Sequence, residues 1–413
     1  MYSVFWTACF STLYTNVNHL TIKVMVVFFR KGEGNTVIYF DNSATTKAHP
    51  KVLETFVEVN EKFWANPASI HEFGHQTNEL LQSAREQVAE ILHTTNDKVY
   101  FTSGGTESNN LAVVGLANKY KHRGKHILVS AVEHPSVIEA AKHLALTGFD
   151  VEWIPVDPDG VILVETVKQM LRSDTVLVSV MHVNNETGAI QPIGKLSSMI
   201  RKNSRALIHV DAVQSFGKLP VHFQEFDVDA ITISSHKING LKGSGLLALK
   251  KFVEVEPMLL GGGQEFGIRS GTTPVPLAVC TAKAMRLATE KFNEKVQKMQ
   301  RMTDEIVLFL SSFPAIKLIS PQKRAPHIVT FSVSKIKGEV IINALQQKNV
   351  IVSTSSACSS RQTKTSHVLK AMHLQDEYIK GVIRLSISSF NTEEEVNQFK
   401  KIFTHVMNVI KGD

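Results

Sequence analysis

The sequence has little cysteine: three residues in 413, at positions 9, 280 and 358. Three cysteines so far apart are too few for a disulfide framework or a zinc site, so we expect neither, and we expect a reducing compartment. Dense runs of Lys and Arg are also missing. The net charge of +7 therefore does not by itself indicate contact with nucleic acid, and we expect none.

Acidic residues are absent from the first 30 positions, and the apolar stretches there are short and interrupted by polar residues. This pattern favours neither a signal peptide nor a membrane span. Lys31-Gly-Glu-Gly34 can be encoded by purine-rich codons that resemble a bacterial ribosome-binding site. Val37, just after it, can be encoded by GTG, which can act as a start codon. Our hypothesis is that residues 1–36 are a leader that is not native and that the chain starts at Val37, with Met25 as an alternative start.

The whole sequence is 43% apolar and 20% charged. Strand and helix patterns alternate through its first two thirds. Such alternation predicts an α/β fold whose mostly parallel sheet has helices on both faces. The pattern from 276 to 310 predicts one long helix leading to a smaller α/β unit. The expected strands are 126–130, 151–155, 175–182, 206–210 and 230–234, and the helices between them are 136–147, 161–172 and 192–203.

Lys237 stands between an apolar run that begins at Ile231 and a glycine-rich turn. A lysine at the end of a strand can lose its proton and form a Schiff base with an aldehyde such as pyridoxal phosphate. The hydroxyl of Ser234 and the imidazole of His236 would then donate to a phosphate. The alternative is an exposed lysine in a strand-turn-strand element.

A second phosphate signal follows the predicted strand that ends at Ser103. Two glycines, including Gly105, precede a predicted helix that starts near Thr106. Helix N-termini bind anions through free amides and the helix dipole. The alternative is a simple strand-turn-helix unit with a Ser or Thr cap.

Polar residues recur at the ends of other predicted strands, and the carboxyl ends of parallel strands meet at one edge of a sheet. The types suit pyridoxal chemistry. Asp211 can keep a pyridine nitrogen protonated, His134 can stack on the ring and shuttle protons, and Gln214 can donate to the ring oxygen. Asn185 offers a donor and an acceptor beside an amino-acid substrate.

Two more candidates lie in the C-terminal part. Cys358 is surrounded by small polar residues, which is typical of an exposed and mobile nucleophile, although a free surface thiol is the alternative. Arg384 lies in an alternating strand pattern, where it can hold a carboxylate or be a surface charge. Before them, the glycine-rich segment 261–274 predicts a loop that reaches a neighbouring chain's phosphate or is merely exposed to solvent.

Together these residues resemble a pyridoxal phosphate-dependent cysteine desulfurase of the NifS/IscS-like branch of the class V aminotransferases. The resemblance covers residues 37–413 and implies a fold type I homodimer. The expected division is an N-terminal segment 37–44 that joins the small domain, a large domain 45–292 with a mostly parallel seven-stranded sheet, and a small α/β domain 293–413. The motifs are Asp41-Asn-Ser-Ala-Thr-Thr, Ser103-Gly-Gly-Thr-Glu-Ser, Glu133-His134, Asn184-Asn-Glu, Asp211-Ala-Val-Gln, Ser235-His-Lys, Arg269-Ser-Gly-Thr and Ser356-Ala-Cys-Ser.

The resemblance implies a role for each site residue. Lys237 would bond to the cofactor, Cys358 would take sulfur from L-cysteine as a persulfide and leave L-alanine, and Arg384 with Asn185 would hold the substrate carboxylate. The remaining roles concern the cofactor: Asp211 on the pyridine nitrogen, Gln214 on the ring oxygen, His134 stacked on the ring, Gly105, Thr106, Ser234 and His236 on the phosphate, and Thr272 on the phosphate of the partner subunit.

Some alternatives stay open at this point. A selenocysteine lyase or another class V enzyme would not need Cys358, and an inactive scaffold would need none of the catalytic residues. The sulfur acceptor is an iron-sulfur scaffold or a tRNA-thiolating enzyme, and the expected location is the cytoplasm. The sequence departs from the usual pattern at Ala65, where glycine is usual, and at Leu241, where proline is common.

Overall fold

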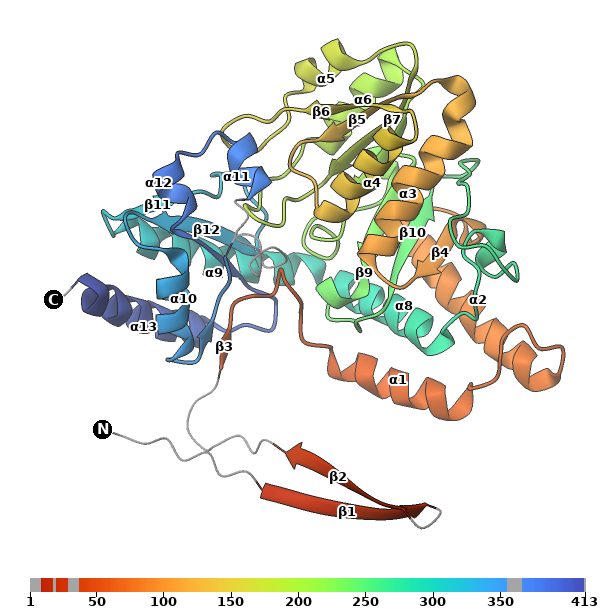
Figure 1. The fold of residues 1–413 in the computed structure, drawn as a ribbon, viewed down its shortest axis with the longest axis horizontal. Coiled ribbons are helices and arrows are strands. Elements are labelled where there is room, and N and C mark those ends of the chain that lie inside the picture. Colours follow the sequence, from red (N-terminus) through yellow and green to blue (C-terminus); the bar gives the residue numbers. More distant parts are fainter. Residues whose placement is uncertain (1–8, 18–19, 29–36, 355–365, 412–413) are drawn as a thin grey trace. The chain divides into compact units, whose positions relative to one another are not determined.

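The structure, a computed structural model, describes residues 9–17, 20–28, 37–354 and 366–411 (Figure 1). The chain divides into two compact units, residues 1–38 and 39–413. In the first, strands β1 (Cys9–Val17) and β2 (Leu20–Phe28) form an antiparallel hairpin in which Val17 lies opposite Leu20. The second unit holds the remaining elements, apart from the first residue of β3 (Ile38–Tyr39).

A seven-stranded sheet forms the centre of the second unit, in the order β4-β10-β9-β8-β7-β5-β6. Only β10 runs antiparallel to its neighbours, which confirms the prediction of a mostly parallel sheet. Every residue of β7 is buried, as expected for a parallel strand covered on both faces. The strands are β4 (Val99–Thr102), β5 (His126–Ser130), β6 (Asp150–Ile154), β7 (Thr175–Met181), β8 (Leu207–Asp211), β9 (Ala230–Ser234) and β10 (Gly245–Leu249).

Helices cover both faces of this sheet (Figure 1). Because side chains alternate along a strand, Ile127 and Val129 of β5 pack with α3 and α4, whereas Leu128 packs in the core formed with α2, α6 and α8. The helices of this layered part are α1 (Pro50–Lys62), α2 (Glu72–Leu92), α3 (Gly105–Tyr120), α4 (Pro135–Leu146), α5 (Val164–Met170), α6 (Ile193–Asn203), α7 (Phe223–Phe226) and α8 (Val275–Thr289), with short 3₁₀ turns η1 (Asn96–Lys98), η2 (Lys121–Arg123), η3 (Ser235–Lys237) and η4 (Glu265–Gly267).

A smaller antiparallel sheet, in the order β11-β12-β14, follows toward the C-terminus. Its helices pack through an aromatic cluster in which the Phe403 ring lies 5.5 Å from that of Phe399 and 5.8 Å from that of Phe331. The elements are α9 (Phe292–Ser311), β11 (Ile316–Leu318), β12 (Ile328–Val333), α10 (Gly338–Gln346), β13 (Val350–Ile351), α11 (His367–Ala371), α12 (Asp376–Ile379), β14 (Val382–Ser386) and α13 (Glu393–Lys411).

The chain between β3 and α1 lies against this smaller sheet. The Phe40 amide donates to the Ile351 carbonyl at 2.9 Å, and the Phe40 carbonyl accepts from the Ser386 amide at 2.7 Å. The Asn42 side chain also donates to the Ser386 carbonyl, at 3.1 Å. The polar turn that begins at Asp41 is therefore fixed at the end of β14, and this turn reaches the site described below.

The prediction of one long helix over 276–310 was wrong. Helix α8 ends at Thr289 and α9 begins at Phe292. Lys291 between them has φ 52° and ψ 37°, a left-handed conformation that ends one helix and redirects the chain. Each helix buries its own apolar face, so the apolar pattern continues across a break that periodicity alone does not reveal.

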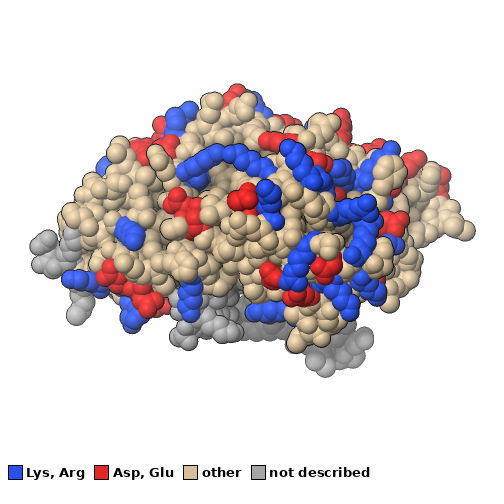
Figure 2. All heavy atoms as spheres, turned by 90° about the horizontal axis from the view of Figure 1, so that it is seen from above, with Lys and Arg blue, Asp and Glu red and all other residues tan. Residues whose placement is uncertain are grey.

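The surface mixes charges of both signs. On the face drawn in Figure 2, Lys and Arg side chains lie among Asp and Glu side chains. None of the helices within the described ranges has both the length and the apolar composition needed to cross a bilayer.

Candidate active site

Lys237 lies directly after the buried strand β9, in the 3₁₀ turn η3. Its side-chain amine donates to the carbonyl of Ser43 at 2.5 Å and to that of Ala44 at 2.7 Å. Both carbonyls belong to the polar turn that follows β3. Lys237 is half-buried, so its amine is not the exposed surface charge that the sequence left as an alternative.

Asp211 is the last residue of β8, the strand next to β9 in the sheet. One carboxylate oxygen accepts from the Asn109 side chain at 2.7 Å, and the other accepts from the Val213 amide at 2.9 Å. The Asn109 amide also donates to the Ser136 hydroxyl, at 2.9 Å. Ser136 in turn bonds to Nδ1 of His134 at 2.8 Å. A chain of hydrogen bonds thus joins Asp211, expected on the pyridine nitrogen, to His134, expected to stack on the ring.

His134 caps the N-terminus of α4, where its Nδ1 accepts from the Ser136 amide at 3.2 Å. Burial lowers the pKa of this imidazole; the Asp211 charge raises it, and Lys237 and His367 lower it further. The ring is therefore neutral near pH 7. Because Nδ1 accepts hydrogen bonds, the proton of the neutral ring is assigned to Nε2.

Glu133, next to His134, is completely buried, and its carboxyl accepts from the Met181 amide at 2.5 Å. Burial, and then the charge of Asp211, raise the pKa of Glu133 well above its usual value. A protonated Glu133 avoids a second buried anion beside Asp211. The sequence placed Glu133 at a strand end but gave it no role.

Gln214 is buried, and both the nitrogen and the oxygen of its side-chain amide form hydrogen bonds. The nitrogen donates to the Ser43 carbonyl at 2.9 Å, and the oxygen accepts from Nε2 of His327 at 3.4 Å. The Ser43 carbonyl therefore receives donors from Lys237 and from Gln214. Ser43 and His327 are site residues that the sequence reasoning missed, because only the tertiary fold brings them here.

The expected phosphate residues gather at the start of α3, which begins at Gly105. A Cβ atom added to Gly105 would lie 3.0 Å from Val213 Cγ2 and 3.4 Å from Ser234 Cβ, so the turns after three strands pack closely here. Thr106 is exposed, which leaves its hydroxyl open to a ligand, whereas Ser234 is buried. The first amides of α3 therefore lie at the edge of the sheet where the parallel strands end. Free amides at a helix N-terminus can bind an anion.

His236 lies beside this edge, and its Nδ1 is 3.1 Å from the Thr45 hydroxyl. Burial, and then the nearby lysine charges of which Lys237 is the largest, lower the pKa of His236 to about 4. The imidazole is therefore neutral near pH 7. It is a hydrogen-bonding group there and not a cation.

Arg384 is 2% exposed, so it is not the surface charge that the sequence also allowed. One guanidinium nitrogen donates to the Asn185 carbonyl at 3.0 Å, and another pairs with Asp41 at 2.9 Å. The structure thus places the Arg384 guanidinium against the Asn185 backbone. A substrate carboxylate that binds Arg384 would share this guanidinium with Asp41.

Two predicted residues are less fully placed. Cys358 lies in 355–365, outside the described residues. The described chain on either side is anchored near Arg384: Ser353 exchanges backbone hydrogen bonds with Arg384, and the Ser366 hydroxyl donates to Glu186 at 2.6 Å. Thr272 is exposed, on a loop whose Arg269 pairs with Glu107 in the first turn of α3 at 2.8 Å.

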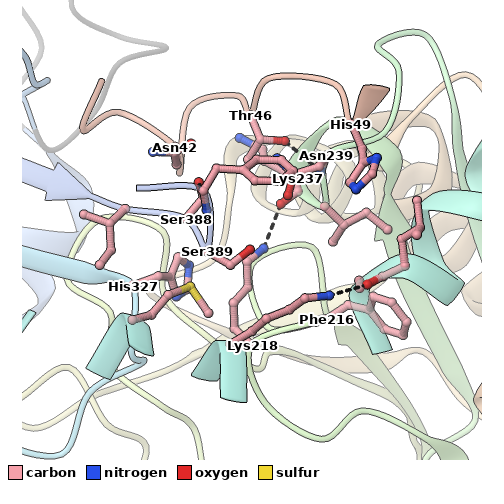
Figure 3. Close-up of a pocket in the computed structure, with 18 residues that line it drawn as sticks. Asn42, Thr46, His49, Phe216, Lys218, Lys237, Asn239, His327, Ser388 and Ser389 are labelled. Carbon is pink, nitrogen blue, oxygen red and sulfur yellow. Dashed lines mark hydrogen bonds between the residues drawn. The ribbon is translucent and has the colours of Figure 1, made fainter. Parts of the chain in front are cut away.

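A cavity of about 80 Å³ borders the backbone of Lys237 (Figure 3). Lys218, His327 and Lys295 are among the side chains that line it. Within the described chain its lining includes neither Asp211 nor His134. Figure 3 shows the Lys218 side chain extending to the Lys237 carbonyl, at 2.8 Å.

The residues present fit pyridoxal phosphate. A Cβ at Gly105 would crowd Val213 and Ser234, so a glycine leaves the most room beside the first turn of α3, which suits a phosphate. A buried carboxylate at the end of β8 suits a pyridinium nitrogen, and an amine at the end of β9 suits an aldehyde.

Comparison with known proteins gives a consistent family. The chain is 41% identical over 374 residues to a NifS/IcsS protein homolog of Lactobacillus delbrueckii subsp. bulgaricus, covering 90% of this chain and 97% of that protein. It is 39% identical over 375 residues to cysteine desulfurase IscS 1 of Archaeoglobus fulgidus, covering 91% of this chain and 98% of that protein. A solved structure titled NifS-like protein superposes with a TM-score of 0.85 at 35% identity, covering 91% of this chain and all 100% of that one. The family model described as aminotransferase class-V matches residues 38–399, and the chain therefore belongs to the class V aminotransferase family.

Proposed function

We propose that this protein is a pyridoxal phosphate-dependent cysteine desulfurase that converts L-cysteine to L-alanine and keeps the sulfur as a persulfide on Cys358. The observation that carries the proposal is that Asp211 ends β8 and Lys237 follows the adjacent strand β9, in the turn η3. The names of relatives such as the Archaeoglobus fulgidus IscS 1 support the choice of substrate.

Bound pyridoxal phosphate would supply an electron sink for the charge left when bonds at the substrate α-carbon break. Lys237 would hold the aldehyde carbon and Asp211 the pyridine nitrogen. Gly105, Thr106, Ser234 and His236 would bind the phosphate. The bond from Asn109 keeps the Asp211 carboxylate in place from behind.

The remaining side chains would bind the substrate and move protons. Arg384 and Asn185 would orient the carboxylate of L-cysteine. His134 would stack on the ring and would hold or release a proton at Nε2, since its Nδ1 accepts from Ser136. The Cys358 thiolate would attack the substrate sulfur, so that an S–S bond forms, the C–S bond breaks and the carbon retains the electron pair that a proton then neutralises.

We further propose a homodimer with 37–44 joining the small domain, a large domain 45–292 and a small domain 293–413. The exposed Thr272 would bind the phosphate of the partner subunit. Its loop is held beside α3 of its own chain by the pair between Arg269 and Glu107. An iron-sulfur scaffold or a tRNA-thiolating enzyme would receive the sulfur.

The test incubates purified protein with L-cysteine and pyridoxal phosphate, measures alanine and locates added sulfur by peptide mass. We expect alanine and extra sulfur on Cys358, and we expect Cys358→Ser to abolish both products of the cysteine reaction. A selenocysteine lyase would keep its activity on selenocysteine in that variant. A protein that cannot take up the cofactor at Lys237 would overturn the proposal.

A further inference from the structure

The carbonyl groups of η3 are bound from several directions. The Ser235 carbonyl accepts from the amides of Ile238 at 3.1 Å and Gly240 at 2.9 Å, within the turn itself. The His236 carbonyl accepts from the amide of Thr46 at 2.9 Å and from its hydroxyl at 2.8 Å. Both sets of bonds hold the turn to its own segment or to the polar turn after β3.

The Lys237 carbonyl is bound by a side chain from a different part of the chain. The amine of Lys218 donates to it at 2.8 Å. Lys218 lies in the turns that follow β8 and Asp211, where its own amide donates to the Ser215 carbonyl at 3.0 Å. This bond therefore links the turn after β8 to the turn after β9.

Burial of the Lys218 amine costs folding free energy. Lys218 is only 9% exposed, and none of the ion pairs formed within the described residues includes its amine. The nearby ionisable groups are Lys237, His236 and the buried His327. A buried amine without an acidic partner destabilises a fold, and an apolar side chain of the same size would avoid the cost. Stability alone does not account for lysine at this position.

We propose that Lys218 is a positioning residue for Lys237, tying the segment that carries Asp211 to the turn that carries the reactive amine. This inference rests on the proposed function, in which Asp211 and Lys237 bind two atoms of one cofactor ring system.

The sheet alone does not set this distance. Asp211 lies opposite Thr232 in the register of β8 and β9, and the Ala212 amide donates to the Thr232 carbonyl at 3.0 Å. Beyond that point each chain enters its own turn. Two links join the turns: the Ser43 carbonyl accepts from both Gln214 and Lys237, and the Lys218 amine donates directly to the Lys237 carbonyl. A shift of about 1 Å in a reacting group can cost on the order of 100-fold in rate.

Lys295 offers a matched control. It lines the same cavity, and its amine also donates to a backbone carbonyl, that of Leu287 at 2.5 Å. Leu287 is in α8 and not in η3. A Lys295→Met variant thus loses a lysine-to-carbonyl bond at the same cavity without touching the turn of Lys237.

The experiment compares wild-type protein with Lys218→Met, Lys218→Arg and Lys295→Met. Each is freed of cofactor, titrated with pyridoxal phosphate and reduced with borohydride, and the modified lysine is quantified by peptide mass. The kcat and KM for L-cysteine are measured in parallel on cofactor-loaded protein, and melting temperatures establish that each variant is folded.

For Lys218→Met we expect slower modification at Lys237 and a kcat about 10- to 100-fold lower, with KM within about twofold of wild type, because Arg384 and Asn185 are untouched. Lys218→Arg should recover most of the kcat, since the cavity of about 80 Å³ beside it has room for a guanidinium. Lys295→Met should behave as wild type. If Lys218→Met does not fold, Lys218→Ala is measured in its place with the same expectations.

Wild-type modification and kcat in Lys218→Met or Lys218→Ala would overturn the inference, and so would an equal loss in Lys295→Met. Failure of the proposed function looks different. Wild-type protein would then take up no cofactor at Lys237, whatever stands at position 218.

Discussion

At the scale of single residues, Asn109 connects Asp211 to His134 through Ser136. It is 1% exposed within α3, whose other buried residues are mainly apolar. Its side-chain nitrogen donates to Asp211 and to Ser136, and Ser136 bonds to His134. Asparagine has a lower helix propensity than most apolar residues, and burial removes its side-chain amide from water. The hydrogen bond to the buried Asp211 carboxylate compensates for both costs.

Replacing Asn109 with alanine should lower both stability and activity. The carboxylate of Asp211 would lose a charge-assisted donor, so we expect the free energy of unfolding to fall by about 1–3 kcal/mol. We also expect a lower affinity for pyridoxal phosphate, about tenfold, because Asp211 would no longer be held in place. Urea unfolding and cofactor titration measure the two effects.

The neighbouring Asn110 provides the control for this change. Its side chain donates to the Thr106 carbonyl at 2.9 Å, within the helix, and not to Asp211. Asn110→Ala should therefore shift stability by less than about 1 kcal/mol and leave cofactor affinity unchanged. Equal effects of the two substitutions would contradict the role given to Asn109.

Lys218 gives a pH dependence with a definite sign. Burial, and then the charge of Lys237, lower its pKa from 10.5 to about 7. Between pH 7 and 10.5 the unfolded chain binds a proton at this site that the folded protein does not bind. The free energy of unfolding contributed by Lys218 therefore rises with pH across this window, by up to about 1.4 kcal/mol per pH unit, and falls as pH drops toward 7.

The measurement compares urea unfolding of wild type and Lys218→Met at several pH values. Methionine does not titrate, so the wild type should gain stability relative to the variant as pH rises from 7 to 10.5. Curves that stay parallel over the whole window would show that Lys218 keeps an ordinary pKa in the folded protein.

The sequence predicted the residues of the site better than their contacts. Lys237 and Asp211 stand out because strand ends of an α/β fold and their residue types point to one chemistry. Arg384 was left open between holding a carboxylate and being a surface charge, and its burial in the structure excludes the surface charge. Asn109 and Lys218 carried no such signal. Their partners, Asp211 and the Lys237 carbonyl, depend on how distant segments pack, and no periodicity or motif spacing encodes that.

At the scale of elements, a buried ion pair holds the loop before α8 to the edge of the sheet. Arg85 of α2 forms two hydrogen bonds with Glu265, at 2.7 and 2.9 Å, and donates to the Val99 carbonyl at 2.5 Å. Glu265 also accepts from the Phe101 amide at 2.8 Å. The guanidinium lies 5.1 Å from the Phe101 ring and 5.0 Å from the Phe266 ring, so α2, β4 and the loop meet at one charged group.

Arg85→Met should be strongly destabilising, by about 3–5 kcal/mol, because it leaves the Glu265 carboxylate buried without its cation. The double variant Arg85→Met with Glu265→Gln should recover part of this loss. Arg172→Met, which removes pairs with Asp150 and Glu152 at the surface, should cost less than about 1 kcal/mol. Urea unfolding measures all three, and a small effect at Arg85 would contradict this account.

The sequence predicted some helices and strands better than others. The alternation of apolar strands and amphipathic helices predicted the layered sheet, and β9 was expected at 230–234, where it is found. The break between α8 and α9 was missed, because Lys291 adopts a left-handed conformation without being glycine or asparagine.

At the scale of the whole molecule, large apolar side chains remain exposed on the single chain. Trp64 and Ile70 flank the loop between α1 and α2, and Leu260 precedes the glycine-rich loop of Thr272. Exposed apolar groups of this size are typical of surfaces that another protein covers. In the proposed homodimer the partner subunit would cover them, and the same contact would bring Thr272 to the partner's phosphate site.

We therefore expect the wild-type protein to sediment as a dimer and Ile70→Asp to weaken the dimer at least about 100-fold, because each interface would bury an unpaired carboxylate. Cofactor affinity should fall at protein concentrations where the variant is monomeric and recover where it is dimeric, since Thr272 acts across the contact. Leu146→Asp, at an exposed leucine at the end of α4, serves as the control and should stay dimeric. A dimeric and fully active Ile70→Asp variant would place the contact elsewhere, and a wild-type monomer that binds the cofactor fully would remove the need for a partner's Thr272.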